Sequence, residues 1–351
     1  MKFDFVIGNP PYQDPYKNAD GTDINKGSGA NSIYNDFMDA AEKISDKVLL
    51  ITPGRFLFNA GSTPKSWNKK KLNDTHFKVL EYESNSDLIF PSLSNPIKGG
   101  VAITYFDKNA EFGAIGVFTK YKDLNSIIHK VMKHTKESLE IICITSYAYR
   151  FTMRSHQDFP QMVQLMSKGH SHDLTSNCME VLPFIFYDEE PRDKHKYVRI
   201  LGRKNNQRLY KYIRKDYIND VPNLYKWKIF ISKASGNGDF GEKIAEPVIG
   251  EIGLGSTETF MSIGLFDEKE TAENLCKYIK TKFLRTMLGI LKVTQDLSPS
   301  KFGYVPIQDF TLKSDINWSK SIREIDKQLY KKYKLTKEEI EFIETHVKEM
   351  E

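Results

Sequence analysis

The residues best suited to chemistry are Asn9, Pro10, Pro11 and Tyr12, which follow a short apolar run. The Asn9 amide oxygen and the Pro10 carbonyl can each accept an N–H of an exocyclic amine on a nucleobase, and the prolines fix the direction of that carbonyl. Two acceptors favour a tetrahedral nitrogen whose lone pair points at an incoming methyl group, so the site requires no histidine or carboxylate. Tyr12 supplies a flat face on which an extruded base can stack. A plain tight turn is the alternative interpretation of these four residues.

Short apolar runs predict the elements that position this motif. They cover residues 3–8, 48–53, 77–82 and 100–106, and a stretch with helical spacing separates the first two. Continuous apolar strands that alternate with helices are typical of a parallel sheet covered on both faces. Residues 13–30 are rich in Gly, Asn, Asp and Lys and predict a loop. We therefore expect an α/β fold over residues 1–120.

The remainder of the chain has a different composition. Residues 121–312 mix polar and aromatic stretches and predict an α+β domain, and residues 313–351 predict a charged helical tail. Apolar residues that recur every three or four positions predict one long helix from Lys269 to Val293. No run of about 18 apolar residues predicts a membrane span. Because Asp4 lies where a signal peptide would begin its apolar stretch, we expect a cytoplasmic protein.

Positive charge is concentrated in one segment. Residues 192–233 contain thirteen basic and three acidic residues, so this segment carries +10 while the rest of the chain carries −5. A basic segment on an acidic body predicts a polyanionic partner bound at one place. Arginine, lysine and asparagine side chains bind phosphates and read base edges. The predicted DNA contacts are Arg199, Arg203, Lys204, Asn205, Asn206, Arg208, Lys211, Arg214 and Lys215. A solvated basic face is the alternative for any single one of them.

At this point the sequence resembles a known family. Residues 6–12, Val-Ile-Gly-Asn-Pro-Pro-Tyr, resemble the catalytic motif of S-adenosylmethionine-dependent N6-adenine DNA methyltransferases. Residues 49–57, 88–91 and 99–106 follow in the order of the later motifs of the gamma-type enzymes of restriction–modification systems, including the type that fuses nuclease and methylase. The resemblance implies that residues 1–120 form a partial Rossmann-like sheet, the catalytic half of a methyltransferase domain. It implies that residues 121–312 form a target-recognition domain for double-stranded DNA with a flipped adenine. It also implies that Phe90 packs on the second face of that adenine, with a core phenylalanine as the alternative.

The chain also departs from this family. In the gamma-type enzymes a half that binds S-adenosylmethionine precedes the Asn-Pro-Pro-Tyr strand, whereas only eight residues precede Asn9 here. We therefore expect the carboxy-terminal part of a longer enzyme, a split subunit with a missing amino-terminal partner, or a gene start at an internal methionine. Such a chain alone should neither bind S-adenosylmethionine nor transfer methyl groups, and residues 3–7 should form a bare apolar edge. Cofactor-binding residues are therefore not assigned.

A circularly permuted enzyme is the alternative arrangement. Gly253-Leu254-Gly255 would then be the cofactor turn, but the residues after it alternate like a strand instead of opening a helix, so we interpret these glycines as a turn. Other chemistry finds less support. His170 with His172 lacks further ligands for a metal, and Asp239 with Glu242 lacks the strand context of a nuclease. The scattered Cys143, Cys178 and Cys276 predict neither a disulfide framework nor a zinc finger.

Two other functions remain open. One is a non-catalytic DNA-specificity module that delivers another subunit to its site. The other is a methyltransferase that uses the same motif on an RNA base or on a glutamine amide of a protein.

Overall fold

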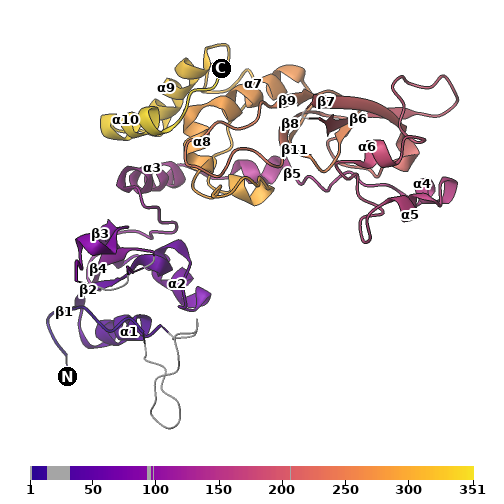
Figure 1. The fold of residues 1–351 in the computed structure, drawn as a ribbon. Coiled ribbons are helices and arrows are strands. Elements are labelled where there is room, and N and C mark those ends of the chain that lie inside the picture. Colours follow the sequence, from indigo (N-terminus) through magenta and orange to yellow (C-terminus); the bar gives the residue numbers. More distant parts are fainter. Residues whose placement is uncertain (1, 14–31, 93–95, 98, 206) are drawn as a thin grey trace, which may run out of the picture. The chain divides into compact units, whose positions relative to one another are not determined.

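The computed structural model describes residues 2–13, 32–92, 96–97, 99–205 and 207–351 (Figure 1). The predicted loop over residues 13–30 lies, apart from Gln13, outside the described residues. The chain divides into two compact units, Met1–Asn125 and Ser126–Glu351, and the division falls within helix α3 (Lys122–Lys133). Among the described residues, no helix is both long and apolar enough to cross a bilayer.

The first unit is built on a four-stranded sheet in the order β1-β2-β4-β3. Its strands are β1 (Val6–Gly8), β2 (Lys47–Pro53), β3 (Phe77–Glu83) and β4 (Val101–Asp107). Strand β1 pairs with β2 in parallel, whereas β4 pairs antiparallel with both β2 and β3. The prediction of a wholly parallel sheet is therefore wrong, because an apolar run reports that a strand is buried but not which way its neighbour runs.

One face of this sheet packs against the helices of the first unit. These are α1 (Tyr34–Ile44), the 3₁₀ helix η1 (Gly54–Phe58) and α2 (Lys65–Leu72). A further 3₁₀ helix, η2 (Ser86–Leu88), follows β3. The core contains Met38 of α1, Leu50 of β2, and Phe56, which is fully buried. Lys71 is also buried, and its ammonium binds the Glu42 carboxylate at 2.6 Å, so α2 is fixed to α1.

The opposite face and the β1 edge are open in the described part of the chain. Leu49 and Tyr105 on that face are only half-buried, and Ile7 of β1 is 73% exposed. Phe3 and Phe5 just before β1 are 48% and 42% exposed. The prediction of a bare apolar edge at residues 3–7 is confirmed, whereas the predicted covering of both faces is not found among the described residues.

The second unit contains two small sheets. One has the order β10-β6-β7, and the other has the order β5-β11-β8-β9. Their strands are β5 (Cys143–Ile144), β6 (Tyr197–Lys204), β7 (Gln207–Arg214), β8 (Trp227–Ser232), β9 (Val248–Gly250), β10 (Leu254–Ser256) and β11 (Phe260–Phe266). The segment at Gly253 therefore leads into strands β10 and β11 and opens no helix, which confirms the strand predicted there and disfavours the permuted arrangement.

The helices of the second unit lie mostly at its two ends. They are α4 (Met153–Asp158), α5 (Met162–Leu165), α6 (Cys178–Val181), α7 (Lys269–Lys280), α8 (Lys282–Leu288), α9 (Ile322–Lys332) and α10 (Lys337–His346), with 3₁₀ turns η3 (Leu139–Ile142), η4 (Lys215–Tyr217) and η5 (Pro299–Phe302). The long helix predicted from Lys269 to Val293 is thus two helices. Thr281 takes an extended conformation between them, and its hydroxyl accepts the backbone N–H of Leu284, which begins a new helix.

Candidate active site

The Asn-Pro-Pro-Tyr segment leaves the sheet at the carboxyl end of β1. Because β1 and β2 are parallel, this end lies beside the carboxyl end of β2, where Pro53 leads into Arg55. Ligands of α/β sheets bind outside the carboxyl ends of parallel strands. Asn9 and Pro11 are exposed and Pro10 is half-buried, so the Asn9 amide is accessible at this edge.

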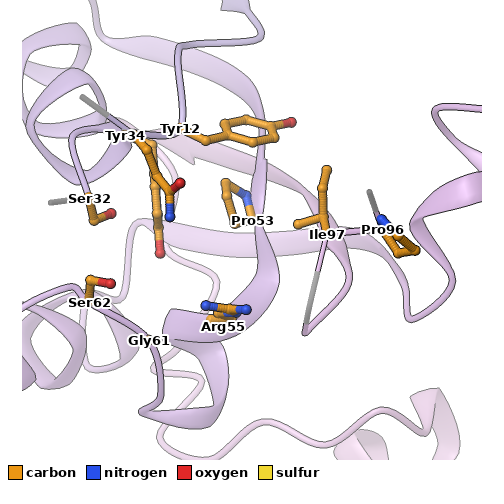
Figure 2. A pocket seen from close by; sticks show the side chains of 10 residues that line it. Tyr12, Ser32, Tyr34, Pro53, Arg55, Gly61, Ser62, Pro96 and Ile97 are labelled. Carbon is orange, nitrogen blue, oxygen red and sulfur yellow. The ribbon is translucent and has the colours of Figure 1, made fainter. Parts of the chain in front are cut away.

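A cavity of about 330 Å³ opens next to the motif (Figure 2). This volume is at the lower end of the range typical of small-molecule sites, about 300–1,000 Å³. Described residues from five segments line it: Tyr12, Gln13, Ser32, Tyr34, Pro53, Arg55, Gly61, Ser62, Pro96 and Ile97. In Figure 2, Tyr12 and Arg55 appear on opposite sides of Pro53. The cavity therefore combines aromatic and apolar walls with a few polar groups and one cation.

Tyr12 lines this cavity, and its backbone is hydrogen-bonded to the segment before α1. Its backbone carbonyl accepts the N–H of Ile33 at 3.3 Å. Its hydroxyl is buried and has no hydrogen-bond partner among the described residues. Burial raises the pKa of Tyr12 to about 12, so the phenol stays neutral near pH 7. An unsatisfied buried hydroxyl costs about 1–3 kcal/mol, which a bound polar ligand would recover.

The sequence did not single out Arg55, Tyr34 or Ile97 as cavity residues. Burial raises the pKa of Tyr34, and the nearby positive charge of Arg55 opposes that rise. Residues 54–57 were part of the family resemblance, but no role was assigned to them. The position of Arg55 in that series of motifs was therefore the only feature of the sequence that could have indicated a role at the site.

Phe90 follows η2 and is half-buried, and its backbone N–H donates to the Ser86 carbonyl at 2.8 Å. It is not among the described residues that line the cavity, where Pro96 and Ile97 from the following segment lie instead. The role predicted for Phe90 therefore stays a prediction.

Most of the predicted DNA-binding residues lie on the antiparallel hairpin of β6 and β7, and Lys215 lies in η4, which follows β7. Arg203 pairs with Arg208 across the hairpin, and Lys204 pairs with Gln207. Asn205 at the tip has a positive φ of 48°, a conformation that asparagine tolerates better than most residues. Asn206 lies outside the described residues. The hairpin thus brings Arg203, Lys204 and Arg208 to one end.

Folding compensates much of the charge of the basic segment. Lys211 pairs with Asp188, and Arg199 pairs with Glu251. The other predicted contacts with carboxylate partners are Arg214 with Asp158 and Asp216, Lys215 with Asp220, and Lys204 with Glu180 at 3.6 Å. Arg208 donates to the Glu246 carbonyl at 2.6 Å. Arg203 is exposed and has no partner within the described residues. The formal charge of +10 counted for residues 192–233 therefore overstates the positive charge available to a partner, because acids from outside this segment pair with several of its cations.

Groups that could hold a metal are not found among the described residues, where no three His, Cys, Asp or Glu side chains gather. His170 instead binds Asp173 at 2.9 Å, and Glu242 binds Lys292 and the backbone N–H groups of Asn237 and Gly238. The three cysteines are free thiols.

Comparisons with known proteins find methylase relatives of this chain. Residues 1–90 match the model of the Eco57I restriction-modification methylase family. An uncharacterized adenine-specific methylase of Mycoplasma pneumoniae is 32% identical over 122 residues, which are 34% of this chain and 27% of that protein. The crystal structure of the type IIG restriction endonuclease BpuSI aligns with 92% of this chain and 48% of its own, at 10% identity and a TM-score of 0.32. The chain thus spans about a quarter of the curated relative and half of the solved one. The resemblance predicted from the motif is confirmed, because residues 1–90 are similar to the Eco57I restriction-modification methylase family and the curated relative is an adenine-specific methylase.

Proposed function

We propose that this chain supplies the base-handling part and the DNA-recognition part of an S-adenosylmethionine-dependent DNA adenine-N6 methyltransferase of a restriction–modification system. The observation that carries the proposal is the placement of the family motif. Asn9 is exposed at the carboxyl end of β1, and Tyr12 of the same motif lines the adjacent cavity.

In the proposed reaction, the Asn9 amide oxygen and the Pro10 carbonyl accept the two N–H groups of an extruded adenine. They fix the amine and raise electron density on its nitrogen, which is electrostatic preorganisation. S-adenosylmethionine, when bound, supplies an electrophilic methyl group. The two acceptors would leave the N6 lone pair free to take that methyl group, and N6 would lose one proton to solvent. Tyr12 stacks on the base and keeps it out of the duplex.

The described residues do not fit a complete cofactor site. The one glycine-rich candidate, residues 253–255, leads into strands rather than into a helix whose amino end could hold a charged group. The exposed apolar side chains of Phe5 and Ile7, on an edge strand with unpaired backbone groups, fit pairing with a further strand. We propose that polypeptide paired with β1 completes the cofactor site, and that the 351-residue chain by itself binds S-adenosylmethionine weakly and is inactive. Isothermal titration calorimetry tests this point, because micromolar binding to the chain alone would contradict it.

For DNA recognition, the proposal places the contacts at the tip of the β6–β7 hairpin. The partner is double-stranded DNA, and the uncompensated cation there is Arg203 within the described residues. The residues at the base of the hairpin are paired with acids and contribute less.

Modification of cellular DNA tests the proposed activity. The gene is deleted in its source cell and complemented with wild type, Asn9→Ala or Asn109→Ala, and N6-methyladenine is mapped on the genome. Asn109 is an exposed asparagine after β4 and serves as the matched control. Wild type and the control should restore methylation at one sequence motif, and Asn9→Ala should not. Full restoration by Asn9→Ala would support the non-catalytic specificity module instead. Changes confined to RNA or to glutamine side chains would identify the other substrate class.

A further inference from the structure

The side chain of Arg55 packs closely against the backbone of two glycines, Gly61 and Gly99. A Cβ atom on Gly99 would lie 2.4 Å from its Cγ, and one on Gly61 would lie 3.1 Å from its Cβ. Both glycines have a φ of +86°, which disfavours other residues. The Arg55 stem therefore packs against two glycines, which limits the positions that its guanidinium can take.

The guanidinium belongs to the wall of the cavity that Tyr12 also lines. Among the described lining residues, Arg55 is the only one with a formal charge, and none is acidic. The other walls are apolar or aromatic, from Tyr12, Pro53 and Ile97, with the Ser62 hydroxyl as a neutral polar group. An aromatic surface for a base and a half-buried cation thus share one cavity (Figure 2).

We infer that Arg55 binds a phosphate of the target nucleotide, so that the cavity recognises adenine together with its backbone phosphate rather than the base alone. This inference rests on the proposed function and adds an anion subsite to it. A planar guanidinium can donate two parallel N–H bonds to a phosphate, and such charge-assisted bonds are among the strongest in proteins. Because the glycines already restrict the side chain, little of its freedom is lost on binding. Arg55 is thus a positioning residue that holds the nucleotide while Asn9 acts on its amine.

Nuclear magnetic resonance titration of the whole chain tests this subsite with small probes. Deoxyadenosine, deoxyadenosine 5′-monophosphate and deoxyadenosine 3′-monophosphate are compared on wild type, Arg55→Gln, Arg55→Lys and Lys69→Gln. Lys69 is an exposed cation of α2, so its variant matches the change in net charge. On wild type, at least one monophosphate should bind about ten-fold or more tightly than the nucleoside, since a hydrogen bond to a charged group contributes about 1.5–3 kcal/mol.

The variants separate the inference from the proposed function. Arg55→Gln should lose the preference for the monophosphate and keep nucleoside binding, Arg55→Lys should retain part of the preference, and Lys69→Gln should behave as wild type. Equal binding of nucleoside and monophosphates to wild type, or a preference unchanged in Arg55→Gln, would overturn the phosphate role and leave the base site intact. Absence of binding by all three probes would reject the base site and the phosphate subsite together. The ¹H–¹⁵N spectrum of each variant verifies its fold.

Discussion

Replacement of Gly99 by alanine tests the close packing of Gly61 and Gly99 against the Arg55 side chain. The new methyl group would lie 2.4 Å from Arg55 Cγ and 3.5 Å from its Cβ and Cδ, so the arginine side chain must move. The left-handed backbone at φ +86° costs an L-residue about 1–2 kcal/mol. Driving Arg55 off its rotamer adds about 0.5–1.5 kcal/mol. We therefore expect Gly99→Ala to destabilise the first unit by about 1.5–3.5 kcal/mol.

Gly116→Ala provides the control for this prediction. Gly116 lies in the same unit with φ +64°, and no atom lies within 4 Å of its added Cβ, so only the backbone penalty of about 1–2 kcal/mol applies. Hydrogen exchange of peptides from β2 and β4 measures the local free energy of opening in the first unit. Gly99→Ala should also weaken monophosphate binding, and Gly116→Ala should not. Equal destabilisation by the two variants, with unchanged ligand binding, would refute the close packing of Arg55.

Two further predictions concern the second unit. Arg203→Ala should weaken binding to duplex DNA several-fold and lower the salt dependence of binding by about one ion. Lys211→Ala should change DNA affinity little, because the Lys211 cation already pairs with Asp188. Fluorescence anisotropy at several salt concentrations measures both affinities, and equal losses in the two variants would contradict DNA contact at the hairpin tip. Burial raises the pKa of Asp326 to about 7 although it accepts the backbone N–H groups of Lys282 and Phe283. A carboxyl that holds its proton more tightly when folded stabilises most below its unfolded pKa, so the free energy of unfolding should fall between about pH 4 and pH 7, by at most about 1.4 kcal/mol per pH unit. Asp326→Asn should flatten that slope in urea denaturation, and an unchanged slope would assign it to other groups.

The parts of the fold that the sequence predicted are those set by local pattern. Four apolar runs became the strands β1 to β4, and the helical tail predicted for residues 313–351 contains α9 and α10. The motif at Asn9 was found because adjacent residues carry its chemistry. The break at Thr281 was missed because the apolar spacing continues through it, so a periodic pattern cannot distinguish one helix from two.

The features that the sequence could not predict depend on partners distant in the chain. Strand β4 lies between β2 and β3 and runs antiparallel to both, and no run of apolar residues encodes this order or direction. The charge on Lys211 is compensated by Asp188, which lies 23 residues earlier, and a sum of charges cannot show this pairing. Arg55 lines the cavity, and its stem packs against Gly61 and Gly99 from later segments of the chain.

Recognition of an amino group by two acceptors is the central claim, and binding of adenosine analogues measures it without a cofactor or a target sequence. Adenosine offers two N–H groups to Asn9 and Pro10, whereas N6,N6-dimethyladenosine offers none. Titrations followed by nuclear magnetic resonance should show tighter binding of adenosine to wild type and to Asn109→Ala, and no preference in Asn9→Ala. Equal affinity of wild type for the two nucleosides, or a preference that survives Asn9→Ala, would contradict the account.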